Sequence, residues 1–164
     1  MITREEFKDR ILLHKQTVKT GIQRFIDILA DRAISHDNDK YEPEIFESFY
    51  NAWTKFSGVK FGDAKWKEAL DGVGKSLETH YKNNPHHPQY YSNGINGTNL
   101  IDLIEMLVDW KSACMAYGDC DFGKSLKIQK DRFEIDDQLY GILVNTAKKL
   151  GYLEEENGTG KNNE

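Results

Sequence analysis

Apolar residues recur at helical spacing along most of the chain, which predicts helices. The first stripe advances in steps of three, four or seven residues and indicates one helix reaching roughly residue 33; it consists of Phe7, Ile11, Val18, Ile22, Phe25 and Leu29. Thr3 followed by Glu6 has the spacing of a capping box at the start of this helix. His14 falls on the same stripe, three residues after Ile11.

The polar stretch SHDNDK ends the first pattern, and Pro43 suits the first turn of a second helix. We expect that helix to have an aromatic inner face made of Ile45, Phe46, Phe49, Tyr50 and Trp53. SGVKFG then predicts a turn, and Asp63 can cap a third helix. The stripe of this third helix is Trp66, Leu70, Val73 and Leu77, with His80 next in phase.

The longest irregular stretch, NNPHHPQYYSNGINGTN, separates the third helix from a fourth. Thr98 or Asn99 can cap the fourth helix, LIDLIEMLVDWKSACMA, and two further helices are expected over 121–132 and roughly 137–150. The pattern therefore predicts an all-α fold, a single compact domain of about five to six helices over residues 1–153. The polar tail 154–164 is expected to be disordered.

Charge and composition narrow the kinds of partner. The 164 residues include 27 acidic and 22 basic side chains, a formal net charge of -5, so extended nucleic acid is not an expected partner. The most apolar run, LIDLIEMLV, is too short and too acidic to span a bilayer. Cys114 and Cys120 make no disulfide framework and no CxxC motif. A cytoplasmic location is the expectation.

The histidines suggest a shared chemical role. His14 and His80 lie on apolar stripes, His36 adjoins Asp37 where the first helix ends, and His86 and His87 stand in the proline-fixed loop. A single histidine on an apolar face is usually a core residue. Two of them, together with the HD and HH pairs, favour metal ligation.

The fourth helix supplies carboxylates. Asp102, Glu105 and Asp109 are spaced by three and four residues, which keeps them within an arc of about 60°. Their neighbours are mostly apolar, so this helix is expected to be buried, and buried carboxylates are costly unless something positive faces them. An exposed acidic face is the alternative. Imidazole and carboxylate groups together fit one or two divalent transition metal ions, namely Mn, Fe, Co, Ni or Zn.

Four stretches, HKQTV, HDNDK, HYKNNPHHPQYY and DLIEMLVDWKSA, occur in an order that resembles the HD-domain superfamily of metal-dependent phosphohydrolases. More closely, they resemble an uncharacterised HD-like family of phages and bacteria, over roughly residues 10 to 115. HDNDK is similar to the HDxxK element of the superfamily. No GYP motif follows the HH pair, so cleavage of cyclic dinucleotides in particular is not implied.

The resemblance implies a role for each residue of these motifs. The core metal ligands would be His14, His36, Asp37 and Asp109. Asp37 would be placed to bridge two ions, while His80 and one or both of His86 and His87 would complete a second metal site. Lys40 would hold a substrate phosphate as a point charge, or be an ordinary exposed lysine at a helix start. Asp102 and Glu105 have no firm counterpart and would orient the histidines.

The expected function is a metal-dependent phosphohydrolase acting on a small phosphorylated substrate, a nucleotide or a cyclic or oligonucleotide. A metal-activated water would react, with Asp37 and Lys40 as the catalytic residues. One alternative is a di-iron HD-type oxygenase. Another is a non-catalytic, metal-stabilised protein that binds a host protein through its aromatic second helix. If the protein is phage-encoded, the expected location is the host cytoplasm.

Overall fold

The computed structural model describes residues 2–55, 58, 64–116 and 120–154. Every regular element among these residues is a helix, which confirms the predicted all-α fold. The α-helices are α1 (Arg4–Ser35), α2 (Pro43–Lys55), α3 (Ala64–Val73), α4 (Lys75–Asn83), α5 (Leu100–Ala116), α6 (Phe122–Arg132) and α7 (Asp137–Lys149). Three short 3-10 helices lie between them: η1 (Asn38–Tyr41), η2 (Pro88–Tyr90) and η3 (Gly94–Gly97).

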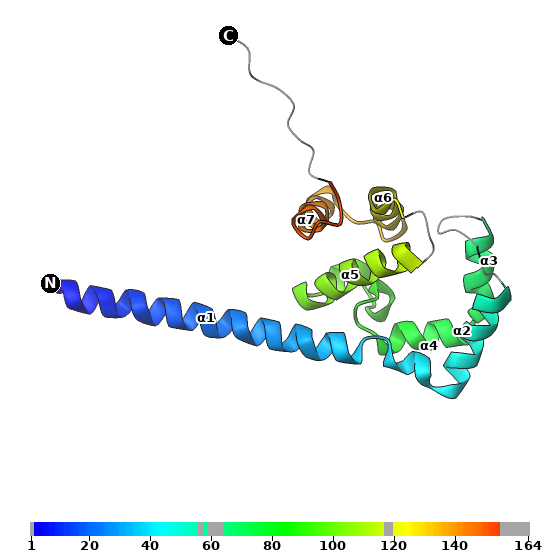
Figure 1. Cartoon of the computed structure of the whole chain (residues 1–164), viewed down its shortest axis with the longest axis horizontal. Coiled ribbons are helices and arrows are strands. Elements are labelled where there is room, and N and C mark those ends of the chain that lie inside the picture. Colours follow the sequence, from blue (N-terminus) through cyan, green and yellow to red (C-terminus); the bar gives the residue numbers. More distant parts are fainter. Residues whose placement is uncertain (1, 56–57, 59–63, 117–119, 155–164) are drawn as a thin grey trace, which may run out of the picture. The chain divides into compact units, whose positions relative to one another are not determined.

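The chain divides into two compact units, residues 1–36 and residues 37–164. The first unit is the single continuous helix α1, drawn in blue in Figure 1. Its predicted capping box is present, because Thr3 Oγ1 accepts from Glu6 N at 3.2 Å and Glu6 Oε2 accepts from Thr3 N at 2.7 Å. None of its residues is buried, so α1 forms no core of its own.

The hydrophobic core of the second unit gathers where α5, α6 and α7 meet. Figure 1 shows α5 lying across the view while α6 and α7 are seen nearly end-on above it. Trp110 of α5 stacks on Phe133, with ring centroids 5.8 Å apart and planes 2° from parallel. The buried apolar side chains of these three helices are Met106, Leu107, Trp110, Cys114, Phe122, Leu126, Leu143 and Ala147.

The predicted third helix is broken in two. Gly74 has φ +54° and ψ -125°, a positive-φ conformation that favours glycine; α3 ends just before it, and α4 begins at the next residue. His80 therefore belongs to α4. The expected cap Asp63, most of the SGVKFG turn, the side chains of Trp66 and Leu70, and residues 155–164 of the tail lie outside the described residues.

The prediction of which α2 residues face inward is only partly correct. Ile45 is buried and Phe49 is half-buried, but Phe46, Tyr50 and Trp53, which lie next to them on the same band, are exposed. Spacing alone could not separate these residues, since all five fall on a continuous band around α2.

Two further features concern the surface and the cysteines. Cys114 and Cys120 form a disulfide, which the spacing of two cysteines did not predict.

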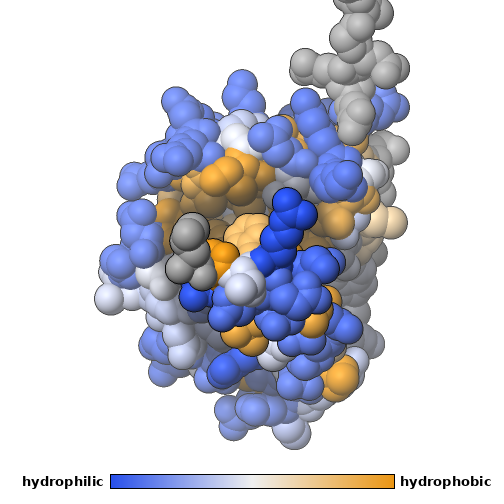
Figure 2. Space-filling view, turned by 90° about the vertical axis from the view of Figure 1, so that its left-hand side faces the viewer, coloured by the Kyte–Doolittle hydropathy of each residue, from blue (hydrophilic) through white to orange (hydrophobic). Residues whose placement is uncertain are grey.

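In Figure 2 hydrophilic residues cover most of the visible face, with hydrophobic residues between them, as expected for a charge-rich chain. No helix in the described part of the chain is long and apolar enough to cross a membrane.

Candidate metal centre

The first residues of the second unit, DNDK, form a tight turn whose two acidic side chains, Asp37 and Asp39, face His80 of α4. Asp37 has left-handed φ and ψ angles of 56° and 19°, a conformation that aspartate tolerates better than most residues. The turn is closed by Lys40 N donating to the Asp37 carbonyl at 2.9 Å. The side chains also meet, with Lys40 Nζ 2.6 Å from Asp37 Oδ2. The other oxygen of Asp37 is thereby left facing the histidines.

Those histidines come from the end of α4 and the loop that follows it. His80 lies in the last turn of α4 and is 1% exposed. Asn84 Nδ2 donates to the His80 carbonyl at 2.8 Å, and His87 N donates to the Asn84 carbonyl at 3.0 Å. This folded loop brings His86, also 1% exposed, and His87 back beside His80.

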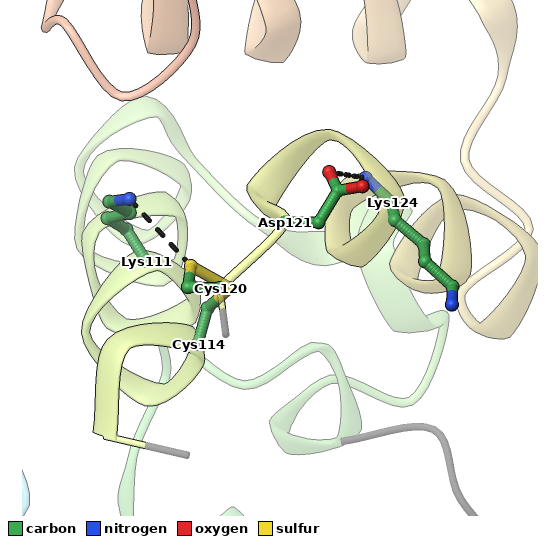
Figure 3. Close-up of a disulfide and its surroundings, with 5 residues drawn as sticks. All are labelled: Lys111, Cys114, Cys120, Asp121 and Lys124. Atoms are coloured by element: carbon green, nitrogen blue, oxygen red, sulfur yellow. Dashed lines mark hydrogen bonds between the residues drawn. A yellow bond between two sulfur atoms is a disulfide. The ribbon is translucent and has the colours of Figure 1, made fainter. Parts of the chain in front are cut away.

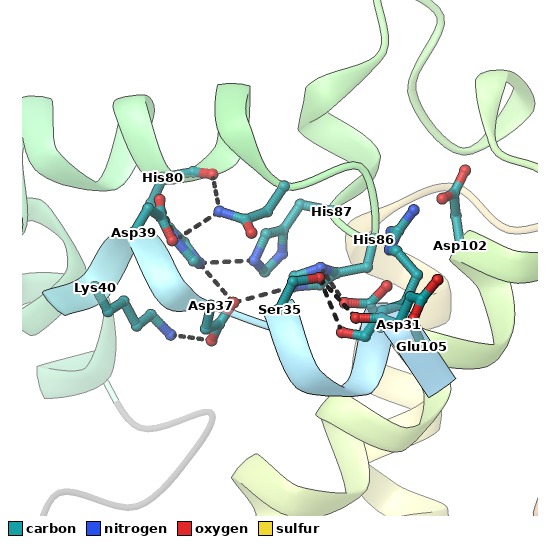
Figure 4. Close-up of polar contacts among 12 residues, drawn as sticks. Asp31, Ser35, Asp37, Asp39, Lys40, His80, His86, His87, Asp102 and Glu105 are labelled. Atoms are coloured by element: carbon teal, nitrogen blue, oxygen red, sulfur yellow. Dashed lines mark hydrogen bonds and ion pairs between the residues drawn. The ribbon is translucent and has the colours of Figure 1, made fainter. Parts of the chain in front are cut away.

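Four side chains converge at one point: Asp37, His80, His86 and His87. Each offers one ligand atom, and these atoms all lie within 4.8 Å of one another. Asp37 Oδ1 is 3.5 Å from His80 Nε2 and 3.3 Å from His86 Nε2. His80 Nε2 and His87 Nε2 are 2.9 Å apart, and Figure 4 shows these two rings pointing toward each other.

The spacing of these atoms suits a divalent cation. Ligand atoms about 2.1 Å from an ion lie about 3.0 Å apart at right angles and about 3.4 Å apart at the tetrahedral angle. The observed separations of 2.9, 3.3 and 3.5 Å fall around those two values. The group of one carboxylate and three imidazoles can therefore hold a metal ion.

Two carboxylates behind the histidines fix the orientation of the rings. Asp39 lies 3.0 Å from His80 Nδ1, and Glu105 of α5 lies 3.0 Å from His86 Nδ1. A carboxylate on one ring nitrogen holds the proton there and leaves the other nitrogen free to coordinate. In both histidines the nitrogen left to coordinate is the Nε2 that faces Asp37 (Figure 4).

The environment separates the pKa values of the three histidines. Burial, followed by the charge of Lys40, lowers the pKa of His80. Burial and the adjacent His86 and His80 lower the pKa of His87 to about 2. Burial alone would also lower the pKa of His86, but hydrogen bonds and charges from Asp37 and Glu105 outweigh it and raise the pKa. Two rings are thus held neutral, the form that binds metals.

Of the remaining predicted carboxylates, Asp102 is fully buried. Asp102 Oδ2 accepts from Tyr91 Oη at 2.5 Å and from Asn99 N at 3.2 Å. These bonds tie the loop that carries the histidines to the start of α5. Asp109 is half-buried, and one of its oxygens lies within 4.8 Å of a carboxylate oxygen of Asp37.

His14 and His36 belong to residues 1–36, the unit that α1 forms. His14 is exposed on α1, and His36 follows the last residue of that helix. Their expected role as metal ligands stays a prediction. The second unit by itself brings together Asp37 and the three later histidines.

Sequence reasoning missed two residues of this centre, Asp39 and Asn84. Asp39 follows Asp37 by two residues, and its contact with His80 spans 41 positions of the chain. No local pattern distinguishes it from the exposed Asn38 beside it. Asn84 was expected only as a loop residue, although its place four residues after His80 allows the bond to the His80 carbonyl.

Comparison with known proteins identifies one family. Its model matches residues 3–150, which is most of the chain, and it is described as a family of unknown function, DUF5662. No curated protein and no solved structure matches the chain. The chain belongs to the DUF5662 family of unknown function.

Proposed function

We propose that this protein is a metal-dependent phosphohydrolase of the HD type that acts on a small phosphorylated substrate. The proposal places a divalent transition metal ion among Asp37, His80, His86 and His87. It rests on one observation above all. A single carboxylate, that of Asp37, faces two imidazole nitrogens with one oxygen and the ammonium of Lys40 with the other.

The position of Lys40 is what favours a phosphate. Its side chain is 37% exposed, so a ligand can reach the ammonium from solvent. The Phe49 ring lies 5.2 Å from Nζ and helps to keep the side chain beside the cluster. Phosphate oxygens bound near Asp37 would therefore meet a fixed positive charge.

The metal supplies the remaining chemistry. A bound divalent cation lowers the pKa of a coordinated water and neutralises phosphate oxygens. The chain's own residues hold and orient it: Asp37 gives a charged oxygen, and Asp39 keeps His80 Nε2 turned toward that oxygen. The net charge of -5 suits a small substrate better than a nucleic acid polymer.

A structural metal is the second candidate. Four protein ligands around one point are typical of closed structural sites, whereas catalytic zinc usually has three and an open position. In that case the ion stabilises the fold, and the protein acts through its surface.

Metal analysis followed by a substrate screen separates the two candidates. The full chain is loaded with Mn, Co, Ni, Zn or Fe and assayed against nucleotides and simple phosphodiesters. Lys40→Met is compared with Lys82→Met, an exposed lysine of α4. We expect Lys40→Met to lose turnover at unchanged metal content and Lys82→Met to retain it. Stoichiometric metal without turnover, and loss of the fold on chelation, would leave only the structural candidate.

A further inference from the structure

A second reactive group lies at the junction of α5 and α6. Cys114, in the last turn of α5, is bonded to Cys120, just before α6, and their Cα atoms are 5.2 Å apart. Lys111 Nζ lies 3.8 Å from the sulfur of Cys120. Figure 3 shows the Lys111 side chain beside this sulfur. This group shares no residue with the metal centre.

The two sulfurs have different surroundings. Cys114 is 9% exposed and belongs to the hydrophobic core, whereas Cys120 is half-buried and more accessible to solvent. The ammonium of Lys111 lies over two rings, 5.4 Å from the Phe122 centroid and 5.9 Å from that of Tyr152. These cation–π contacts keep the charge near Cys120.

The acid next to Cys120 makes its hydrogen bond within α6. Asp121 follows Cys120 directly, but its carboxylate accepts from Lys124 N at 3.0 Å and caps α6. The Lys124 ammonium points away from the sulfurs in Figure 3. Lys111 therefore provides the positive charge next to Cys120, and such a charge favours the thiolate over the thiol.

We propose that Cys120 and Cys114 form a redox-active thiol pair that hydroperoxides oxidise, with Cys120 as the nucleophile and Cys114 as the resolving residue. This inference goes beyond the proposed function and does not depend on it. In the reducing cytoplasm expected from the sequence, a disulfide that forms is usually transient or redox-sensing.

The chemistry balances in two steps. The Cys120 thiolate attacks the outer oxygen of the peroxide, which breaks the O–O bond, gives the sulfenic acid and releases water or an alcohol once the leaving oxygen is protonated. The Cys114 thiol then attacks the Cys120 sulfur, which forms the disulfide, breaks the S–O bond of the sulfenic acid and releases the hydroxyl group as water. Two thiols lose two electrons and the peroxide gains them. A dithiol then reduces the disulfide back to two thiols by thiol–disulfide exchange and is itself oxidised to a disulfide.

The test uses the full chain, reduced with a dithiol and then freed of it. Hydrogen peroxide is added, and thiol loss and the mass change of the Cys114–Cys120 peptide are followed. We expect two thiols to disappear together with the loss of two hydrogens. In Cys114→Ser, and in Cys114→Ala should serine not be tolerated in the core, a sulfenic-acid probe should label Cys120. Cys120→Ser should show little labelling of Cys114.

Variants at Lys111 test whether its charge activates the sulfur. Lys111→Met should slow the reaction of Cys120 with hydrogen peroxide about three- to tenfold, since less of the thiol is ionised. Lys111→Arg should restore most of the rate, because it keeps the charge. Lys124→Met is the matched control and should react like the natural protein.

Three results would overturn the proposal. Resistance of the disulfide to millimolar dithiol in the folded chain would show that it is a permanent structural bond. Labelling of Cys114 rather than Cys120 would reverse the assigned roles. Equal rates of oxidation for Lys111→Met and Lys124→Met would show that the charge of Lys111 does not activate Cys120.

Discussion

Asp39 and Glu105 contact two histidines of the candidate metal centre. Each carboxylate lies 3.0 Å from an Nδ1 atom and turns the opposite nitrogen toward Asp37. We expect Asp39→Asn to weaken zinc binding about 10- to 100-fold, because the amide no longer fixes the proton and the ring as firmly. Competition with a coloured chelator measures the affinity. Asp131→Asn, an exposed acid of α6, should leave it unchanged; equal losses in both variants would contradict the orienting role.

His86 should control how metal binding depends on pH. Its pKa lies above the ordinary value of 6.5, while those of His80 and His87 are lowered. Only neutral imidazole binds metal, so as pH falls the proton on His86 competes first. Affinity should be constant above that pKa and then fall about tenfold per pH unit, the slope for one proton.

Glu105→Gln provides the control for this pH dependence. Glu105 is one of the two carboxylates that raise the pKa of His86. Without its charge, the decline in affinity should begin at a lower pH. Measurements of zinc affinity from about pH 5 to about pH 8 test both points. Two results would be inconsistent with His86 titrating first. One is an affinity that initially falls a hundredfold or more per pH unit, the slope for two or more protons. The other is a decline that begins at the same pH in Glu105→Gln as in the natural protein.

Residue types and spacing predicted most of the residues of the candidate centre, but not which side chains contact one another. The HD pair, His80 and the HH pair were singled out, and four of these side chains do converge. Asp102 was expected to orient a histidine, and its Oδ2 atom accepts from Tyr91 and Asn99, two partners that the spacing did not indicate. Which carboxylate faces which ring depends on how η1, α4 and α5 pack, and local spacing carries no information about contacts made across 41 positions.

At the scale of the helices, N-terminal caps are the features easiest to test. Asp136 accepts from Leu139 N at 2.8 Å at the start of α7, whose Leu143 and Ala147 are buried in the core. Asp136→Ala should lower the free energy of unfolding by about 0.5–2 kcal/mol, measured with urea. Asp131→Ala removes an exposed acid without a capping role and should change it by less than about 0.5 kcal/mol. An Asp136→Ala variant as stable as this control would mean that the cap contributes nothing.

Helix starts and periods were more predictable than the faces that helices bury. The Thr3–Glu6 capping box was correct because both of its bonds are local. The break at Gly74 was not predicted, because a single glycine within an apolar repeat does not by itself indicate the end of a helix. In the structure Gly74, with φ +54°, separates α3 from α4. The aromatic band of α2 was assigned inward as a whole, although packing against α3 and α4 covers only part of it.

Among the described residues of the second unit, the candidate metal ligands and the hydrophobic core come from different segments. The candidate ligands come from the residue that precedes η1, the end of α4 and the loop before η2, whereas the core cluster draws mainly on α5, α6 and α7. In the described part of this unit α5 contributes to both, because Glu105 contacts the candidate ligand His86 while Met106 and Trp110 belong to the core. An ion would therefore cross-link segments whose described residues include no buried apolar side chain.

This arrangement predicts that metal stabilises the folded chain strongly. Zinc at about 100 times its dissociation constant should raise the free energy of unfolding by about 2.7 kcal/mol, because the unfolded chain does not assemble the four ligands. Thermal unfolding with zinc and with a chelator measures the shift. His87→Ala should lose most of it, while Asp131→Asn should keep it, since Asp131 lies outside the ligand group. An equal shift in His87→Ala would place the ion elsewhere, because the four-residue group could not then be its binding site.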